Sequence, residues 1–217
     1  MGYILFLSAV AAIGGILFGY DTAVISGTTG IVSEQFGLNT MQQGWFVGCA
    51  LIGSIAGVLC AGMMSDKFGR KLTMIISAIL FSISAAGCAV SADFTQLVIY
   101  RIIGGIGIGI VSIVSPIYIS EVAPAEKRGS LVSMYQLAIT IGFLAAYLIN
   151  FIILGYALDA SSVHEGTVWK YFGSEYWRGM LGCELIPDAL FLFVILLVPE
   201  SPRWLIVNGK RDRAAPI

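Results

Sequence analysis

Several ionisable residues stand inside long apolar stretches of this chain, and three of them are Asp21, Arg101 and Glu184. A charge in hydrocarbon costs about 3 kcal/mol or more unless it is paired, so it rarely persists without a partner or a purpose. A carboxylate beside a movable guanidinium can bind a proton when the guanidinium leaves and release it when the guanidinium returns. The three residues therefore predict a proton-coupling site. The alternative is a static ion pair that holds helices together.

The composition indicates the environment of these residues. Of the 217 residues, 58% are hydrophobic and only 12% are charged, whereas soluble domains carry about 25% charged residues. With a mean hydropathy of +0.90, the chain is expected to be an integral membrane protein. The net charge of −1 argues against nucleic-acid binding, which requires a basic surface. The sequence also lacks the nucleophile, metal-ligand and phosphate-loop patterns that would indicate an enzyme.

Six apolar runs are long enough to cross a membrane, since about 20 helical residues span roughly 30 Å of hydrocarbon. The runs are residues 3–28, 41–64, 72–91, 95–121, 130–153 and 177–198. They predict an all-α protein with six transmembrane helices. Glycines also recur four residues apart, which predicts helices whose backbones pack closely. These pairs are Gly15 and Gly19, Gly53 and Gly57, and Gly105 and Gly109.

The distribution of lysine and arginine predicts the orientation in the membrane. Nine of these residues fall in the second-to-third connection, the fourth-to-fifth connection and the C-terminal tail, which share one side: Lys67, Arg70, Lys71, Lys127, Arg128, Arg203, Lys210, Arg211 and Arg213. Only Lys170 and Arg178 fall on the other side. Because cytoplasmic loops are enriched in Lys and Arg, we expect both ends of the chain to be cytoplasmic.

This topology places the three ionisable residues at a similar depth. At 1.5 Å per residue, Asp21, Arg101 and Glu184 each lie roughly 10 Å below the outer surface. One arginine cannot neutralise both carboxylates, so proton binding at this layer is expected to be sensitive to movement of the arginine. Asp188 follows Glu184 by one helical turn and has no Lys or Arg at its depth. It is either protonated or faces a wet cavity, and the sequence leaves both interpretations open.

A series of motifs, in order along the chain, carries a family resemblance. They are Phe18–Gly27, Ser65-Asp66-Lys67-Phe68-Gly69-Arg70-Lys71, Tyr100-Arg101 with its following glycines, Pro116 to Pro124, Lys127-Arg128-Gly129, Gln136 to Gly142, Trp177-Arg178 and Pro199-Glu200-Ser201-Pro202-Arg203-Trp204-Leu205. Together they resemble the sugar porter family of the major facilitator superfamily, and most of all its bacterial proton–xylose symporters. The resemblance covers the whole chain.

The resemblance implies a proton-coupled monosaccharide symporter that works by alternating access, is driven by the proton gradient and needs no cofactor. Asp21 matches the proton-coupling aspartate, with Arg101 as its partner and Glu184 as a modulator. Phe18 and Gln136 match sugar-cavity positions, although an amide such as that of Gln136 could instead bond between helices. A cytoplasmic gate is implied at Arg70, Glu121, Arg128, Glu200 and Arg203. A passive uniporter and a non-transporting sugar sensor are the alternatives.

The resemblance also implies a division of the chain. Residues 1–198 match the N-terminal six-helix bundle of a twelve-helix fold, and residues 199–217 match the start of a cytoplasmic linker. Substrate in this fold binds between the two halves. The expected partners are therefore a monosaccharide, protons, the lipid bilayer and a missing C-terminal half. A truncated chain is expected rather than a natural half, although a homodimer with a self-complementary interface is an alternative. Asp188 departs from the family pattern, which has a small apolar residue at that position.

Overall fold

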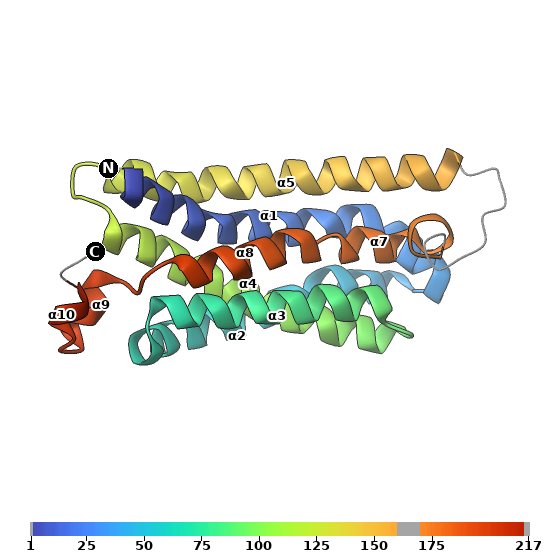
Figure 1. The fold of residues 1–217 in the computed structure, drawn as a ribbon. Coiled ribbons are helices and arrows are strands. Elements are labelled where there is room, and N and C mark those ends of the chain that lie inside the picture. The colour runs from blue at the N-terminus through green and yellow to red at the C-terminus, as the bar shows by residue number, and fades with distance from the viewer. Residues whose placement is uncertain (1, 160–169, 215–217) are drawn as a thin grey trace.

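The computed structural model describes residues 2–159 and 170–214, and within this part every regular element is a helix (Figure 1). The elements are α1 (Gly2–Phe36), α2 (Thr40–Phe68), α3 (Arg70–Val90), α4 (Phe94–Val122), α5 (Arg128–Asp159), the π-helix η1 (Lys170–Ser174), α7 (Tyr176–Gly182), α8 (Leu185–Leu197), α9 (Pro202–Val207) and α10 (Arg211–Ala214). Six helical segments are long and apolar enough to span a membrane, with α7 and α8 together forming the sixth. The predicted all-α, multi-pass architecture is confirmed. Residues 215–217 of the predicted linker lie outside the described part.

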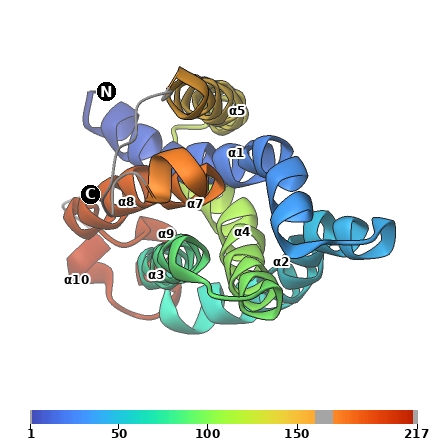
Figure 2. The same ribbon diagram turned by 90° about the vertical axis from the view of Figure 1, so that its right-hand side faces the viewer.

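The spans lie side by side around α4. Seen end-on, α4 lies between α1, α2 and α3, and α5 packs on the outer side of α1 (Figure 2). The sixth span packs against α3 and α1. The short helices α9 and α10 lie at the same end of the bundle as the start of α1 (Figure 1). Residues from α1 and α4 therefore meet in the interior.

Helix α1 is longer than the sequence predicted. Its expected end near residue 28 is wrong, because the polar residues there are satisfied within the helix. Ser26 donates to the carbonyl of Ala23 at 2.8 Å, and Thr29 donates to that of Ile25 at 2.7 Å. Such back-bonding lets hydroxyls continue a helix. The helix ends instead at Phe36, and the next residue, Gly37, has a φ of +61° that suits a glycine cap.

The glycine pairs bring helix backbones into direct contact, as predicted. A Cβ atom on Gly19 would collide with the carbonyl of Ile139 in α5, and one on Gly142 with the carbonyl of Ile16 in α1. The backbones of α2 and α4 are in contact in the same way, at Gly53, Gly57, Gly105 and Gly109. In lipid, where apolar burial does not drive helix association, this close packing is a main source of cohesion.

The sixth span is broken in its interior. Helix α7 ends at Gly182 and α8 begins at Leu185. Pro187 has no N–H to donate to the carbonyl of Cys183, four residues earlier, and its ring crowds that carbonyl. Ile186 donates to this carbonyl instead, at 3.1 Å. The break places Glu184 at a helix joint inside the bundle.

Candidate functional site

Asp21 of α1 and Arg101 of α4 form an ion pair in the interior of the bundle. The guanidinium Nη1 donates to Asp21 Oδ1, and each side chain is only 3% exposed. The predicted pairing of these two residues is therefore present. Removing one partner of such a buried pair typically costs about 3–5 kcal/mol, because the other charge is left uncompensated. The Nε of Arg101 has no hydrogen-bond partner among the described residues.

A pocket of about 270 Å³ opens onto this ion pair. Its walls come from three helices: Phe18, Asp21, Thr22 and Ile25 of α1, Val47, Ala50, Leu51 and Ser54 of α2, and Arg101 and Ile108 of α4. The pocket thus combines apolar walls with one ion pair and two hydroxyls. Phe18, a predicted sugar-cavity residue, is on its wall. Thr22 and Ser54 were not singled out from the sequence, where small hydroxyl residues in apolar helices are too common to be a signal.

Gln136 lies elsewhere, on an exposed face of α5. It is not among the residues that line the pocket at the ion pair. Its side-chain amide makes no hydrogen bond to any residue in the described part of the chain. The structure therefore does not place Gln136 in a helix–helix hydrogen bond.

Glu184 is buried at the joint between α7 and α8, with 3% exposure. It lies close enough to Asp21 and Arg101 for their charges to interact, but it forms no ion pair among the described residues. Its Oε1 has no hydrogen-bond partner there. Beside it, the hydroxyl of Tyr20 donates to the carbonyl of Met180 at 3.1 Å and fastens α1 to α7. The three predicted residues thus share one region, with Glu184 next to the ion pair and outside it.

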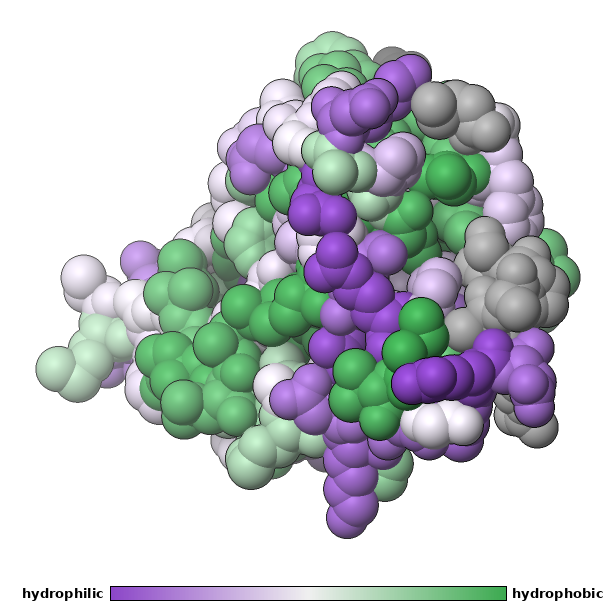
Figure 3. Space-filling model, turned by 90° about the vertical axis from the view of Figure 1, so that its left-hand side faces the viewer, coloured by the Kyte–Doolittle hydropathy of each residue, from purple (hydrophilic) through white to green (hydrophobic). Residues whose placement is uncertain are grey.

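A second cluster of charges lies where α2, α3, α4 and α9 meet. Arg70 Nε donates to Glu121 Oε2 at 3.0 Å, and Arg70 Nη1 donates to Asp66 Oδ1 at 3.1 Å. Figure 3 shows hydrophilic residues gathered across this end of the molecule. Arg70 thus connects the α2–α3 turn to the last turn of α4.

Glu200 joins this cluster through backbone donors. Its Oε1 accepts from the N–H groups of Arg70 at 2.9 Å and Lys71 at 3.1 Å. The carboxylate approaches so closely that a Cβ on Gly69 would collide with it, and Gly69 has a φ of +96°. Only glycine adopts this backbone conformation without strain and leaves room for the carboxylate.

Three further residues of this cluster were not among the predicted gate residues. The hydroxyl of Ser201 donates to Glu121 Oε2, the indole of Trp204 donates to the carbonyl of Asp66 at 2.8 Å, and Tyr118 donates to the carbonyl of Pro199 at 3.0 Å. Ser201 followed by Pro202 is a typical helix start, and this signal could have identified α9. The bonds fasten α9 to the ends of α2 and α4.

Two predicted gate residues make no ion pair within the described part of the chain. Arg203 is exposed on α9, beside a groove of about 410 Å³ that Asp66, Arg70 and Glu121 also line. Arg128 starts α5, and its Nε is buried without a hydrogen-bond partner there. The structure therefore brings together Arg70, Glu121 and Glu200, and leaves Arg128 and Arg203 outside their contacts.

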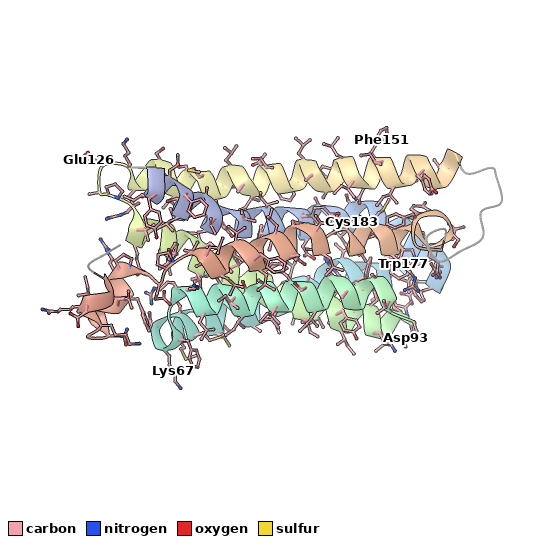
Figure 4. All side chains as sticks on the ribbon, in the orientation of Figure 1. Lys67, Asp93, Glu126, Phe151, Trp177 and Cys183 are labelled. Carbon is pink, nitrogen blue, oxygen red and sulfur yellow. The ribbon has the colours of Figure 1, made fainter. Side chains whose placement is uncertain are left out.

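The opposite end of the bundle has its own polar network, which the sequence did not reveal. Trp177 Nε1 donates to Gln35 Oε1 at 2.6 Å, and Gln35 donates to Glu175 Oε1 at 2.6 Å. Arg178 binds Glu175 Oε2 at 2.7 Å and the carbonyl of Ser91 at 2.6 Å. Figure 4 places Trp177 at the end of the molecule opposite to Lys67. The network ties α1 and α7 to the end of α3.

Comparisons with known proteins agree with this architecture. A family model described as "Sugar (and other) transporter" matches residues 7–217. The chain is 42% identical to the arabinose-proton symporter of Bacillus subtilis over all of its length, and it covers 45% of that protein. It is 41% identical to the D-xylose-proton symporter of Escherichia coli, with 99% of this chain and 47% of that protein covered. The chain thus spans slightly less than half the length of these curated relatives.

Solved structures give the same result. The proton:xylose symporter XylE of the major facilitator superfamily, bound to 6-bromo-6-deoxy-D-glucose, superposes with a TM-score of 0.87 at 40% identity. The match covers 98% of this chain and 48% of that one, and the fold corresponds to its N-terminal half. These relatives are transporters, which supports the expectation that the chain is not an enzyme. The chain belongs to the sugar porter family of the major facilitator superfamily.

Proposed function

We propose that the chain is the N-terminal half of a proton-coupled monosaccharide symporter that works by alternating access. The observation that carries this proposal is the buried ion pair of Asp21 and Arg101 at a pocket between three spans. The names of the relatives, an arabinose-proton and a D-xylose-proton symporter, support both sugar transport and symport. Residues 1–198 form the transmembrane bundle and residues 199–217 begin the linker to a C-terminal half.

Proton coupling follows from the chemistry of the ion pair. An ionised Asp21 holds Arg101, and with it α4, against α1. A proton on Asp21 removes the charge that binds Arg101, so the two helices are free to rearrange. A ligand shifts a conformational equilibrium only by its differential affinity for the two states. Here the proton prefers the state in which the ion pair is open, and Glu184 adjusts this preference from its position beside the ion pair.

The sugar site in this proposal lies partly outside the chain. Phe18 supplies an apolar surface beside the ion pair, and the exposed amide of Gln136 is available to a sugar hydroxyl. The C-terminal half supplies the other wall, since substrate in this fold binds between the halves. The 217 residues alone are therefore not expected to move sugar.

The cluster at Arg70, Glu121 and Glu200 serves as the cytoplasmic gate in this proposal, with Arg128 and Arg203 contributing once the second half is present. Partly exposed ion pairs are each worth about 0–1 kcal/mol. A gate needs contacts that are weak enough to break in each cycle, and several such pairs together bias an equilibrium by a few kcal/mol. Both ends of the chain lie on the cytoplasmic side.

Transport by the full-length protein in proteoliposomes tests the proposal. Sugar uptake is expected to alkalinise the medium, and Asp21→Asn is expected to abolish accumulation while keeping sugar exchange, which also reports a folded protein. Asp212→Asn, an exposed aspartate on α10, is the matched control and is expected to accumulate sugar normally. Accumulation by Asp21→Asn would refute the coupling role. Flux without alkalinisation would indicate a uniporter, and saturable binding without flux would indicate a sensor.

A further inference from the structure

Asp188 is a fully buried carboxyl group for which the proton-coupling site has no role. Its exposure is 0%, and neither of its side-chain oxygens has a hydrogen-bond partner among the described residues. The family resemblance assigns it nothing, because the family has a small apolar residue there. It lines neither the pocket at the ion pair of Asp21 and Arg101 nor the groove beside Arg203.

The position of Asp188 follows from the contacts of its helix with α1. Tyr20 contacts Met180, and further along the bundle Gly14 contacts Phe191. Asp188 lies between these two contacts, one turn beyond Glu184, whose carbonyl accepts its backbone N–H at 3.1 Å. The two carboxyl groups thus continue from the ion pair of Asp21 towards the end of the bundle that carries the Arg70 cluster.

The titratable groups near Glu184 and Asp188 come from the helices packed against them. Tyr20 and Asp21 of α1 and Glu184 itself lie near Asp188, Cys183 at the α7–α8 joint lies near Tyr20, and Cys88 of α3 lies near Glu184. The only cation near them in the described part of the chain is Arg101 of α4, which Asp21 occupies. Tyr20 donates its hydroxyl hydrogen to the carbonyl of Met180, so it does not donate it to Asp188.

Three carboxyl groups therefore share one guanidinium. With Asp21 ionised against Arg101, ionised Glu184 and Asp188 would leave two uncompensated negative charges in the bundle interior. A buried charge without a partner is disfavoured strongly enough that such groups become neutral instead. No three acidic, histidine or cysteine side chains in the described part of the chain converge as ligands for a metal ion. A proton needs no such set of ligands, and it is the counter-ion that fits these two carboxyl groups.

We propose that Glu184 and Asp188 form a second proton-binding site, separate from Asp21 and Arg101, in which Asp188 is a carboxylic acid. Each carboxylate that takes up a proton from water becomes a carboxylic acid, and no other bond changes. That the site holds a proton follows only from the burial and position of the two carboxyl groups. Its use in coupling, as a reserve of protons near Asp21, rests on the function proposed above.

Infrared spectroscopy of the full-length protein in lipid nanodiscs tests the site, because a carboxylic acid has a C=O stretch that a carboxylate lacks. At neutral pH the wild type is expected to show a buried carboxylic-acid band that Asp188→Asn loses and Asp212→Asn keeps. Proton titration is expected to find one proton fewer per chain in Asp188→Asn. If Asp188→Asn does not fold, Asp188→Glu retains the acid and is expected to shift the band. A band unchanged in both folded variants, or one abolished by sodium ions, would overturn the proposal.

The transport assay separates this proposal from the previous one. Asp21→Asn is expected to lose accumulation but keep the Asp188 band. If it still accumulates sugar while the band depends on Asp188, the proton-coupling function fails and the second site stands. If accumulation depends on Asp21 but the band does not depend on Asp188, the second site fails and the coupling function stands.

Discussion

Glu200 binds the backbone of Arg70 although 130 positions separate the two residues, with 2.9 Å between Oε1 and the N–H nitrogen. The same oxygen accepts from Lys71, so one carboxylate satisfies two donors at the first turn of α3. A negative charge at a helix N-terminus is stabilised both by these free N–H groups and by the helix dipole. The segment after the sixth span is thereby anchored to the turn between the second and third spans.

Replacing Glu200 by Gln is expected to loosen the start of α3. The substitution keeps the shape of the side chain but removes the charge, which is worth about 1 kcal/mol at a helix N-terminus. Hydrogen exchange of the amides near Arg70 is expected to become about fivefold faster. Glu126→Gln, an exposed glutamate between α4 and α5, is the control and is expected to leave these amides unchanged. Equal exchange in wild type and Glu200→Gln would contradict the anchoring role.

Gly69→Ala is expected to destabilise the protein by two separate effects. The positive φ disfavours any L side chain by about 1–2 kcal/mol, and the new Cβ also displaces the Glu200 carboxylate. Gly209 has a φ of +74° with open space around it, so Gly209→Ala reports the backbone effect alone. In detergent, the midpoint temperature of thermal unfolding is expected to be lower for Gly69→Ala than for Gly209→Ala. The same loss for both variants would mean that the carboxylate contact adds nothing.

Gly19→Ala tests the seam between α1 and α5. The added methyl meets the carbonyl of Ile139, so the two backbones must separate. We expect a loss of about 1–3 kcal/mol, as for overpacking in a core. Gly62→Ala on α2 points into open space, and is expected to be neutral or stabilising by up to about 1 kcal/mol, because alanine favours helix. Chemical unfolding curves measure both. An unchanged free energy of unfolding in Gly19→Ala would show that the backbones of α1 and α5 can separate without a loss of stability.

The ion pair is expected to respond asymmetrically to loss of either partner. Asp21→Asn leaves a guanidinium that cannot lose its charge, whereas Arg101→Gln leaves a carboxyl that can take up a proton. Asp21→Asn is therefore expected to cost more, about 3 kcal/mol or above, and the double variant is expected to recover part of that loss. A double-mutant cycle on unfolding free energies measures the coupling. Additive losses would mean that the two residues do not stabilise each other.

Arg70→Gln and Arg203→Gln compare an arginine that forms ion pairs with one that forms none within the described part of the chain. Arg70 loses two carboxylate contacts and a bond to the Ser65 carbonyl, so we expect a loss of about 1–2 kcal/mol, a common cost for a broken polar network. Arg203 is exposed on α9, and its replacement is expected to change stability by less than about 0.5 kcal/mol. Thermal unfolding of this chain compares the stability of the two variants. An equal loss of stability in both would contradict the role of Arg70 in holding the charge cluster together.

The spans could be predicted from sequence because crossing hydrocarbon demands long apolar runs, and this constraint leaves few alternatives. The end of α1 could not, since the hydroxyls of Ser26 and Thr29 can either stop a helix or bond back into it, and only the fold decides. The meeting of Asp21 and Arg101 was predicted despite this error, because both residues need a buried partner of opposite charge.

The remaining contacts depend on tertiary structure that the sequence does not specify. Glu200 was expected in a charge network, but its partners are backbone N–H groups, which carry no signature of their own. The joint at Glu184 had a visible signal in Pro187, since proline interrupts a helix one turn earlier. Arg128 and Arg203 match family positions, yet a match in sequence does not specify their partners in space.

The two glycine seams divide the bundle into rigid pairs. Helices α1 and α5 touch along their backbones, and so do α2 and α4, so neither pair can slide internally without driving side chains into carbonyl groups. Asp21 belongs to the first pair and Arg101 to the second. The ion pair therefore crosses the boundary between two stiff bodies, where any relative motion of the pairs must stretch it.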